Sequence, residues 1–195
     1  MLDRFIEYLN AKITLSKEDI ELVQFAVKIK TLRKKQFLIQ EGDLWPYHVF
    51  VCEGLLRSYR VDQNGLEHIV FFAIENWWAG DPESTLSGNP SKNFVEAIEK
   101  SVVILIKDDN FNMLKTSIPG FMDFTNSLIT RSLVAFQNRI HDNISLSAEA
   151  RYLNYLSKYP HLANRVPQHM LASFLGITPA TLSRVRKVTK KNKVL

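Results

Sequence analysis

Residues 166–187 read VPQHMLASFLGITPATLSRVRK, a pattern typical of two short helices joined by a tight turn. Pro167 suits the first turn of the first helix, and Gly176 ends that helix. Thr178 offers a hydroxyl N-cap for the second helix, and Pro179 a pre-set first turn. The apolar seam between the two helices is expected to consist of Leu171, Leu175, Ile177, Leu182 and Val185. We therefore predict a helix-turn-helix, the motif that places its second helix in the DNA major groove, with an ordinary helical hairpin as the alternative.

Basic charge is concentrated in the same part of the chain. Residues 145–195 contain nine Lys and Arg residues and one acidic residue, a net charge of +8, whereas the rest of the chain carries −3. A surface that contacts DNA phosphates requires such a concentration of basic charge. Only a short segment follows Lys187, too little for a β-hairpin wing, and Lys190, Lys191 and Lys193 are expected either to contact phosphate as a tail or to remain solvated.

The composition of the 195 residues excludes several classes of protein. With 46% hydrophobic and 23% charged residues, it is typical of a folded chain, and no run approaches the ~20 apolar residues of a membrane span. The N-terminus lacks the apolar core of a signal peptide. Cys52 is the only cysteine, which excludes intrachain disulfides, Cys-ligated iron–sulfur clusters and Cys-rich zinc sites. A cytoplasmic protein that does not enter the membrane is the simplest interpretation.

The N-terminal part of the chain is predicted to form two helices followed by short strands. Helical patterns cover residues 2–10 and 16–30, and Ser16 with Asp19 suggests a capping box. From about Thr31 the hydrophobic period becomes close to two, and Asn64-Gly65 indicates a hairpin. The strands are expected at residues 35–40, 48–53, 54–62, 66–73, 93–99 and 101–107. Many short strands at this spacing predict an antiparallel sandwich or roll.

A long helix is predicted over residues 118–140, after a helical turn that begins at Asp108. One face carries a seam at spacings of three or four, formed by Ile118, Met122, Thr125, Ile129, Leu133, Phe136 and Ile140. A second face, with Phe121, Phe124 and Leu128, suits packing on the sheet. Two apolar faces imply two partners, so we predict a homodimer through the seam, with a helix buried in a single domain as the alternative. The domains are expected at residues 1–116, 117–143 (dimerisation helix and hinge, the hinge near 141–145) and 144–195, the last beginning with a helix over 147–158.

This order of elements resembles the bacterial Crp/Fnr family, which includes the cyclic-AMP receptor protein. The strongest stretches are residues 166–187 and the run EGD…HVFVCEGLLRSYRVDQNGLEHIVFFAIENWWAGD at 41–81, which is similar to the family's cyclic-nucleotide-binding roll. The resemblance implies an α+β fold with an antiparallel jelly roll, a long dimerisation helix and a C-terminal winged-helix-like helix-turn-helix whose wing is short or absent. It also implies a transcription regulator, not an enzyme, whose partners are double-stranded DNA, a second copy, an unknown small-molecule effector and, for an activator, RNA polymerase.

The effector residues depart from the pattern of the nucleotide-binding members, in which a Gly-Glu pair and a downstream Arg-Ser or Arg-Thr bind ribose and cyclic phosphate. Here Gly80-Asp81 stands for the first pair and Ser91-Lys92 for the second, so the arginine is missing. A serine does not replace the bidentate guanidinium–phosphate contact, and we expect no cyclic-AMP binding of the familiar kind. Gly80, Asp81, Ser84 and Lys92 are candidates to line a pocket for another ligand, or to cap a loop.

Other cofactors of the family are also tested by the sequence. Sensing through an iron–sulfur cluster needs several cysteines, and Cys52 is alone. The histidines have no diagnostic spacing for haem or for another metal, so we expect neither; they are His48, His68, His141, His161 and His169. An enzyme on a cupin-like roll would need converging metal ligands, and His48 and His68 lack that clustering.

In the family, the first turn of the second helix carries the residues that contact the bases. Pro179 and Ala180 occupy positions where many members have Arg and Glu, so the expected DNA target differs from the familiar half-site. Ser183 and Arg184 remain as base-contacting candidates, Arg184 suiting guanine. Phosphate contacts are expected from Gln168, His169, Thr178 and Thr181, and Arg186 and Lys187 complete the polar face. The alternative is a ligand-binding or protein-interaction module that does not bind DNA.

Overall fold

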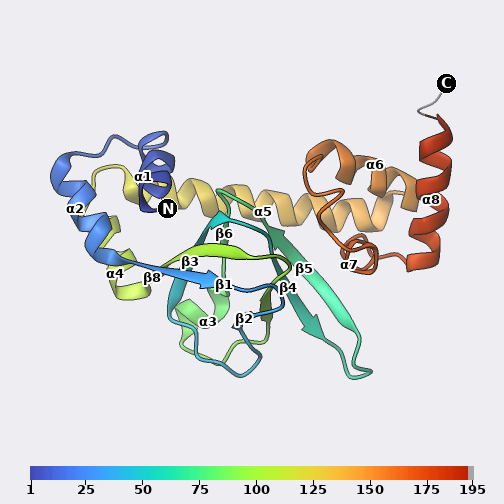
Figure 1. The fold of residues 1–195 in the computed structure, drawn as a ribbon, viewed down its shortest axis with the longest axis horizontal. Coiled ribbons are helices and arrows are strands. Elements are labelled where there is room, and N and C mark those ends of the chain that lie inside the picture. Colours follow the sequence, from blue (N-terminus) through green and yellow to red (C-terminus); the bar gives the residue numbers. More distant parts are fainter. Residues whose placement is uncertain (193–195) are drawn as a thin grey trace. The chain divides into compact units, whose positions relative to one another are not determined.

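The computed structural model describes residues 1–192, with side chains through Thr189. The tail contacts predicted for Lys190, Lys191 and Lys193 lie outside the described part of the chain. The chain forms two compact units, one of residues 1–60 and 71–130 and the other of residues 61–70 and the chain from 131 onward. Figure 1 labels most of the helices and strands of the two units.

The described part of the chain contains eight strands that form an antiparallel roll. They are β1 (Val27–Leu32), β2 (Phe37–Ile39), β3 (Tyr47–Glu53), β4 (Leu56–Val61), β5 (Glu67–Ala73), β6 (Trp78–Ala79), β7 (Phe94–Ala97) and β8 (Ser101–Lys107). The roll was predicted, but β1 and β6 were not among the six strands expected from the sequence. One sheet has the order β1-β8-β3-β6 and the other the order β2-β7-β4-β5. A core of aliphatic residues from both sheets is fully or almost fully buried, including Leu32, Leu38, Val49, Leu56, Val95 and Val103.

The first two helices are α1 (Leu2–Asn10) and α2 (Lys17–Ala26). The predicted capping box is confirmed: the Ser16 hydroxyl accepts from the Asp19 amide at 3.1 Å, and the Asp19 carboxylate accepts from the Ser16 amide at 2.9 Å. The expected helix over 16–30 is too long, because β1 begins at Val27 and pairs with β8 along its whole length. Its β-branched residues alternate with lysines, and this alternation favours a strand over a helix.

Asn64 and Gly65 form the turn between β4 and β5, which confirms the predicted hairpin. Gly65 has a φ of +79°, in the left-handed region that glycine adopts without strain. The Asp62 carboxylate accepts from the amides of Asn64 at 2.8 Å and Leu66 at 3.0 Å. The Asp62 side chain therefore stabilises the turn.

Two short helices complete the roll: α3 (Pro82–Ser87) and α4 (Asp108–Ser117). The predicted helical turn at Asp108 is thereby confirmed. The long helix is α5 (Phe121–Ser145), which begins after Gly120. Phe121 and Phe124 are buried with Phe5, Phe50 and the ring of Phe111, and Leu128 packs against the same cluster. The face of α5 predicted to pack on the roll therefore does so.

The end of α5 differs from the predicted hinge at 141–145, because those residues are helical. The backbone breaks only at Leu146 and Ser147, where α6 (Ala148–Lys158) begins. The Ser147 hydroxyl accepts from the Ala150 amide at 3.2 Å and caps α6, as expected for a helix over 147–158.

Candidate nucleic-acid interface

Two helices follow α6: α7 (Gln168–Phe174) and α8 (Pro179–Asn192). Pro167 is the N-cap of α7 rather than a residue of its first turn. Gly176 has a φ of +63° and forms the turn, in which the Ile177 amide donates to the Ala172 carbonyl at 3.0 Å. The seam between the helices is buried at Leu171, Leu175 and Leu182, and Ala172 is also fully buried there. The predicted helix-turn-helix is thus confirmed.

Thr178 caps α8, as the sequence indicated. Its hydroxyl oxygen accepts from the Thr181 amide at 3.1 Å and lies 2.9 Å from the Thr181 hydroxyl. The two hydroxyls predicted to contact phosphate therefore bond to each other in the described structure. Each retains further hydrogen-bonding capacity, because a hydroxyl has one donor and two acceptor sites.

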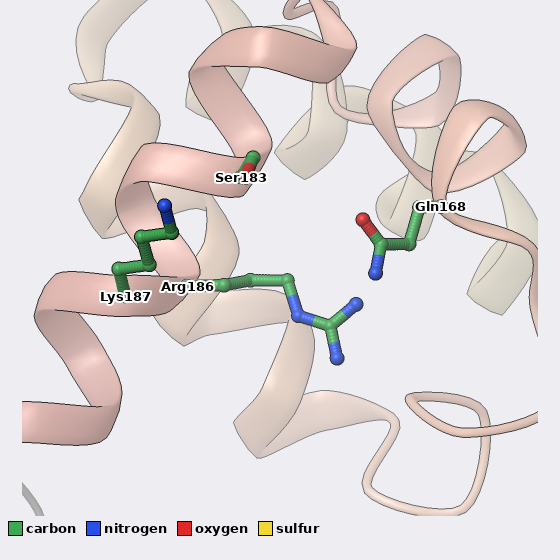
Figure 2. Close-up of a pocket in the computed structure, with 4 residues that line it drawn as sticks. All are labelled: Gln168, Ser183, Arg186 and Lys187. Carbon is green, nitrogen blue, oxygen red and sulfur yellow. The ribbon is translucent and has the colours of Figure 1, made fainter.

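Four of the predicted DNA-binding residues lie around one shallow pocket of about 170 Å³, lined by Gln168, Ser183, Arg186 and Lys187. Figure 2 shows the Arg186 side chain extending from α8 toward the Gln168 amide at the start of α7. The lining thus combines a guanidinium, an ammonium, an amide and a hydroxyl, and none of the four carries negative charge. These groups suit an anion such as a phosphate, which accepts hydrogen bonds from all of them.

The structure does not bring the other four candidates into this pocket. His169 and Arg184 are exposed, and Thr178 and Thr181 lie at the N-terminal cap of α8. Arg184 follows Ser183 on the side of α8 away from buried Leu182, so its guanidinium is accessible to a major groove. The base-contacting role of Arg184 remains a prediction.

The predicted seam on α5 is only partly exposed. Five of its members have exposed fractions of 40–65%: Met122, Ile129, Leu133, Phe136 and Ile140. Ile118 (2%) and Thr125 (4%) are instead buried, so neither can contact a second copy. Ile118 precedes Gly120 and packs in the roll core, and Thr125 lies beside buried Phe121 and Phe124 on the same face of the helix. Ile144, 82% exposed, continues the spacing and was missed because residues 141–145 were interpreted as a hinge.

Comparison with known proteins agrees with this architecture. Residues 29–117 match the cyclic nucleotide-binding domain family. The fumarate and nitrate reduction regulatory protein of Yersinia pestis is 23% identical over 99% of this chain and 81% of its own length. The regulatory protein HlyX of Actinobacillus pleuropneumoniae is 24% identical over 92% of this chain and 79% of its own.

Solved structures share the fold along most of the chain. FixK2 from Bradyrhizobium japonicum superposes with a TM-score of 0.76 at 18% identity, covering 87% of each chain. A regulator assigned to the Crp/Fnr family from Eubacterium rectale gives a TM-score of 0.68 at 14% identity, over 91% of this chain and 85% of that one. The chain is thus similar in sequence to bacterial regulatory proteins and in fold to solved regulators, one of them assigned to the Crp/Fnr family. The two curated relatives are named as regulatory proteins.

We call the candidate effector residues Gly80, Asp81, Ser84, Ser91 and Lys92 the effector cassette. Hydrogen bonds within the same segment of the chain hold it together. The Asp81 carboxylate caps α3, accepting from the Glu83 amide at 3.1 Å, and it also accepts from the Ser91 hydroxyl at 2.6 Å. The Ser84 hydroxyl donates to the Asn89 carbonyl at 2.6 Å. Gly80 is buried, with a φ of +114°. The polar groups of Asp81, Ser84 and Ser91 therefore have hydrogen-bond partners within the same segment.

A cyclic phosphate does not fit these residues. Asp81 and Ser91 are both 2% exposed and hydrogen-bonded to each other, so a buried carboxylate lies beside the position where an arginine would hold the phosphate. The negative charge of the Asp81 carboxylate would repel a phosphate at that position. Lys92 points to Glu83 instead, in an exposed ion pair of 2.5 Å.

The remaining cofactor candidates have structural partners. Cys52 is buried in the roll core, and burial raises the pKa of its thiol. His48 bonds to Asp108 at 2.8 Å and stacks on Phe111 at 3.8 Å between ring centroids, and His68 bonds to Asp62 at 2.8 Å. Within residues 1–192, His, Cys, Asp and Glu form no group of three placed to hold a metal ion. In the same part of the chain, none of the helices has the length and apolar content needed to cross a membrane.

Proposed function

We propose that this chain binds double-stranded DNA as a homodimer, acting in the cytoplasm as a sequence-specific transcription regulator. The second helix of its helix-turn-helix, α8, would lie in the major groove, with Arg184 and Ser183 toward base edges. The pocket of Gln168, Ser183, Arg186 and Lys187 would hold a backbone phosphate, and RNA polymerase would be the further partner of an activator.

The observation that carries this proposal is the pocket between α7 and α8. Gln168 and Arg186 come from different helices, and the packing of Leu171 and Leu182 between those helices fixes their separation. A phosphate bound there would contact both helices at once and so set the depth of α8 in the groove. The net charge of +8 over residues 145–195 supplies the long-range attraction.

The exposed row on α5 supports the homodimer. Leu133, Phe136 and Ile140 follow at spacings of three and four and are 40–57% exposed. Pairing with a second copy of the row would remove them from water and give two α8 helices related by a twofold axis. The same row on each copy satisfies the requirement of a twofold interface that each surface complements itself.

We further propose that the roll responds to an effector that is not a cyclic nucleotide. The Asp81–Ser91 bond of 2.6 Å supports this view, because it occupies the groups that would otherwise hold a cyclic phosphate. Four residues would then either stabilise the α3 loop or line a pocket that opens when that loop moves: Gly80, Asp81, Ser84 and Lys92.

Salt dependence of DNA binding tests the proposal. Affinity measured by fluorescence anisotropy on duplex DNA should fall steeply between 50 and 200 mM salt, by about 10³-fold or more if six or more phosphates are contacted. A protein-interaction module would show no affinity for DNA, or an affinity with almost no salt dependence. That outcome would contradict the proposal.

A further inference from the structure

Residues 67–70 of β5 and the helix α7 lie in the same compact unit. β5 is the outermost strand of its sheet, so one row of its amides and carbonyls has no neighbouring strand. The Ser173 hydroxyl of α7 accepts from the Ile69 amide at 3.0 Å and donates to the Glu67 carbonyl at 3.0 Å. It therefore forms the two bonds that an adjacent strand would otherwise form.

Arg139 of α5 adds a third bond to the same stretch, because its guanidinium donates to the Val70 carbonyl. The guanidinium also lies over the rings of Phe174 at 4.9 Å and Phe136 at 5.8 Å. Ser173 and Arg139 together thus hold residues 67–70 from two helices. We call this set of contacts the β5–α7 clasp.

The Arg139 contact of the clasp removes a cation from water. Arg139 is largely buried, and in the described part of the chain it forms no ion pair and its Nε has no hydrogen-bond acceptor. Burying a cation without a counter-ion costs free energy, which the Val70 carbonyl and the two rings only partly offset. Opening the clasp would return the guanidinium to water.

We propose that the β5–α7 clasp positions the helix-turn-helix for DNA binding and transmits movement of the β4–β5 hairpin to it. The hairpin strands continue directly into the roll, and α7 begins at Gln168, which lines the proposed phosphate pocket. A closed clasp fixes α7 before DNA arrives, so less conformational freedom is lost on binding. This proposal rests on the DNA-binding function proposed above.

The test uses the full-length chain with Ser173→Ala, which removes both hydroxyl bonds. Ser173→Thr keeps the hydroxyl, and Ser157→Ala on exposed α6 is the matched control. Hydrogen exchange at the Ile69 amide and affinity for a selected DNA site are measured for each. Circular dichroism establishes that each variant retains the wild-type helix content.

In Ser173→Ala, we expect Ile69 exchange to accelerate and DNA affinity to fall, each by about tenfold, the combined effect of two modest hydrogen bonds. Ser173→Thr should restore both values, and Ser157→Ala should change neither. Unchanged exchange in Ser173→Ala would show that the clasp does not form. Faster exchange with unchanged or tighter DNA binding would overturn its positioning role. If the wild-type chain binds no DNA, the proposed function fails and the positioning role with it, whereas Ile69 exchange still decides whether the clasp exists.

Discussion

The Arg57 guanidinium on β4 and the Glu96 carboxylate on β7 form an ion pair inside the roll, with 2.8 Å between Nε and Oε2. Arg57 is 6% exposed and Glu96 8%, and the two residues are directly opposite each other in the ladder. The guanidinium also lies 4.1 Å from the ring centre of Tyr59. The two charges are thus removed from water together and depend on each other.

Glu96→Gln should therefore destabilise the roll by about 3–5 kcal/mol, because it removes the buried carboxylate that accepts from the Arg57 guanidinium. Urea unfolding followed by tryptophan fluorescence measures this change. The double variant Arg57→Met, Glu96→Leu, which removes both charges, should recover most of the loss. A single-variant cost below about 1 kcal/mol would show that the pair is solvated in solution.

Arg184 and Arg186 should have different effects on DNA binding. Arg184→Ala should cost about 1–3 kcal/mol on the cognate site and relax one base position, whereas Arg186→Ala should weaken all sequences equally and lower the salt slope by about 1. Affinities for the cognate and single-mismatch duplexes across a salt series measure both effects. Lys12→Ala, which removes an exposed charge near the N-terminus, is the control. If Arg184→Ala weakened all sequences equally, the base-contacting assignment would be wrong.

The exposed row on α5 predicts the oligomeric state. Leu133→Glu should convert a dimer to a monomer in analytical ultracentrifugation, because it places a charge in the apolar seam. Asn138→Glu adds the same charge on the opposite side of α5 and should leave the dimer intact. A monomeric wild-type chain at micromolar concentration would contradict the account of α5.

His48 predicts a pH dependence of stability. Burial lowers the pKa of His48 below its ordinary value of 6.5, an effect that the bond to Asp108 opposes but does not reverse. The folded state therefore binds this proton less tightly than the unfolded state does. The resulting stability is present above pH 6.5 and is lost as the pH falls through the lowered pKa. Unfolding free energies measured from pH 8 to pH 5 should show a smaller loss in His48→Gln than in the wild type. An equal loss in both would assign the dependence to other groups.

The Asp81 cap predicts how the cassette responds to ligand and mutation. Asp81→Ala should lower stability by about 0.5–2 kcal/mol, the usual cost of losing a helix N-cap. A ligand that binds the folded state raises the melting temperature. Because we expect no binding of cyclic AMP, adding it should leave the melting temperature of the wild type unchanged. A rise on adding cyclic AMP would contradict our interpretation of the cassette.

Local sequence signals predicted much of the fold. The Ser16–Asp19 capping box, the Asn64-Gly65 turn and the Thr178 cap depend on residues a few positions apart, and the structure contains all three. The boundary between α2 and β1 was misplaced because the strand-like alternation of residues 27–30 is short and follows directly on a helical pattern. Pairing with β8 over the whole of residues 27–32 confirms the strand.

Contacts distant in sequence could not be predicted in this way. Ile118 and Thr125 fit the spacing of the seam, but spacing does not show that the roll already covers them. Ser173 bonds to Glu67, 106 positions away, and a serine on a short helix carries no signal of such a partner. The pocket could not be predicted either, because Gln168 and Arg186 come together only when the two helices pack.

Selection of bound sites from random duplex DNA by the purified full-length chain tests the central claim most directly. A dimer that places one α8 in each of two successive major grooves predicts enrichment of a palindromic sequence. Its half-sites should be about 10 base pairs apart, centre to centre. Failure to enrich any sequence, or enrichment of a single half-site without its inverted copy, would contradict the account.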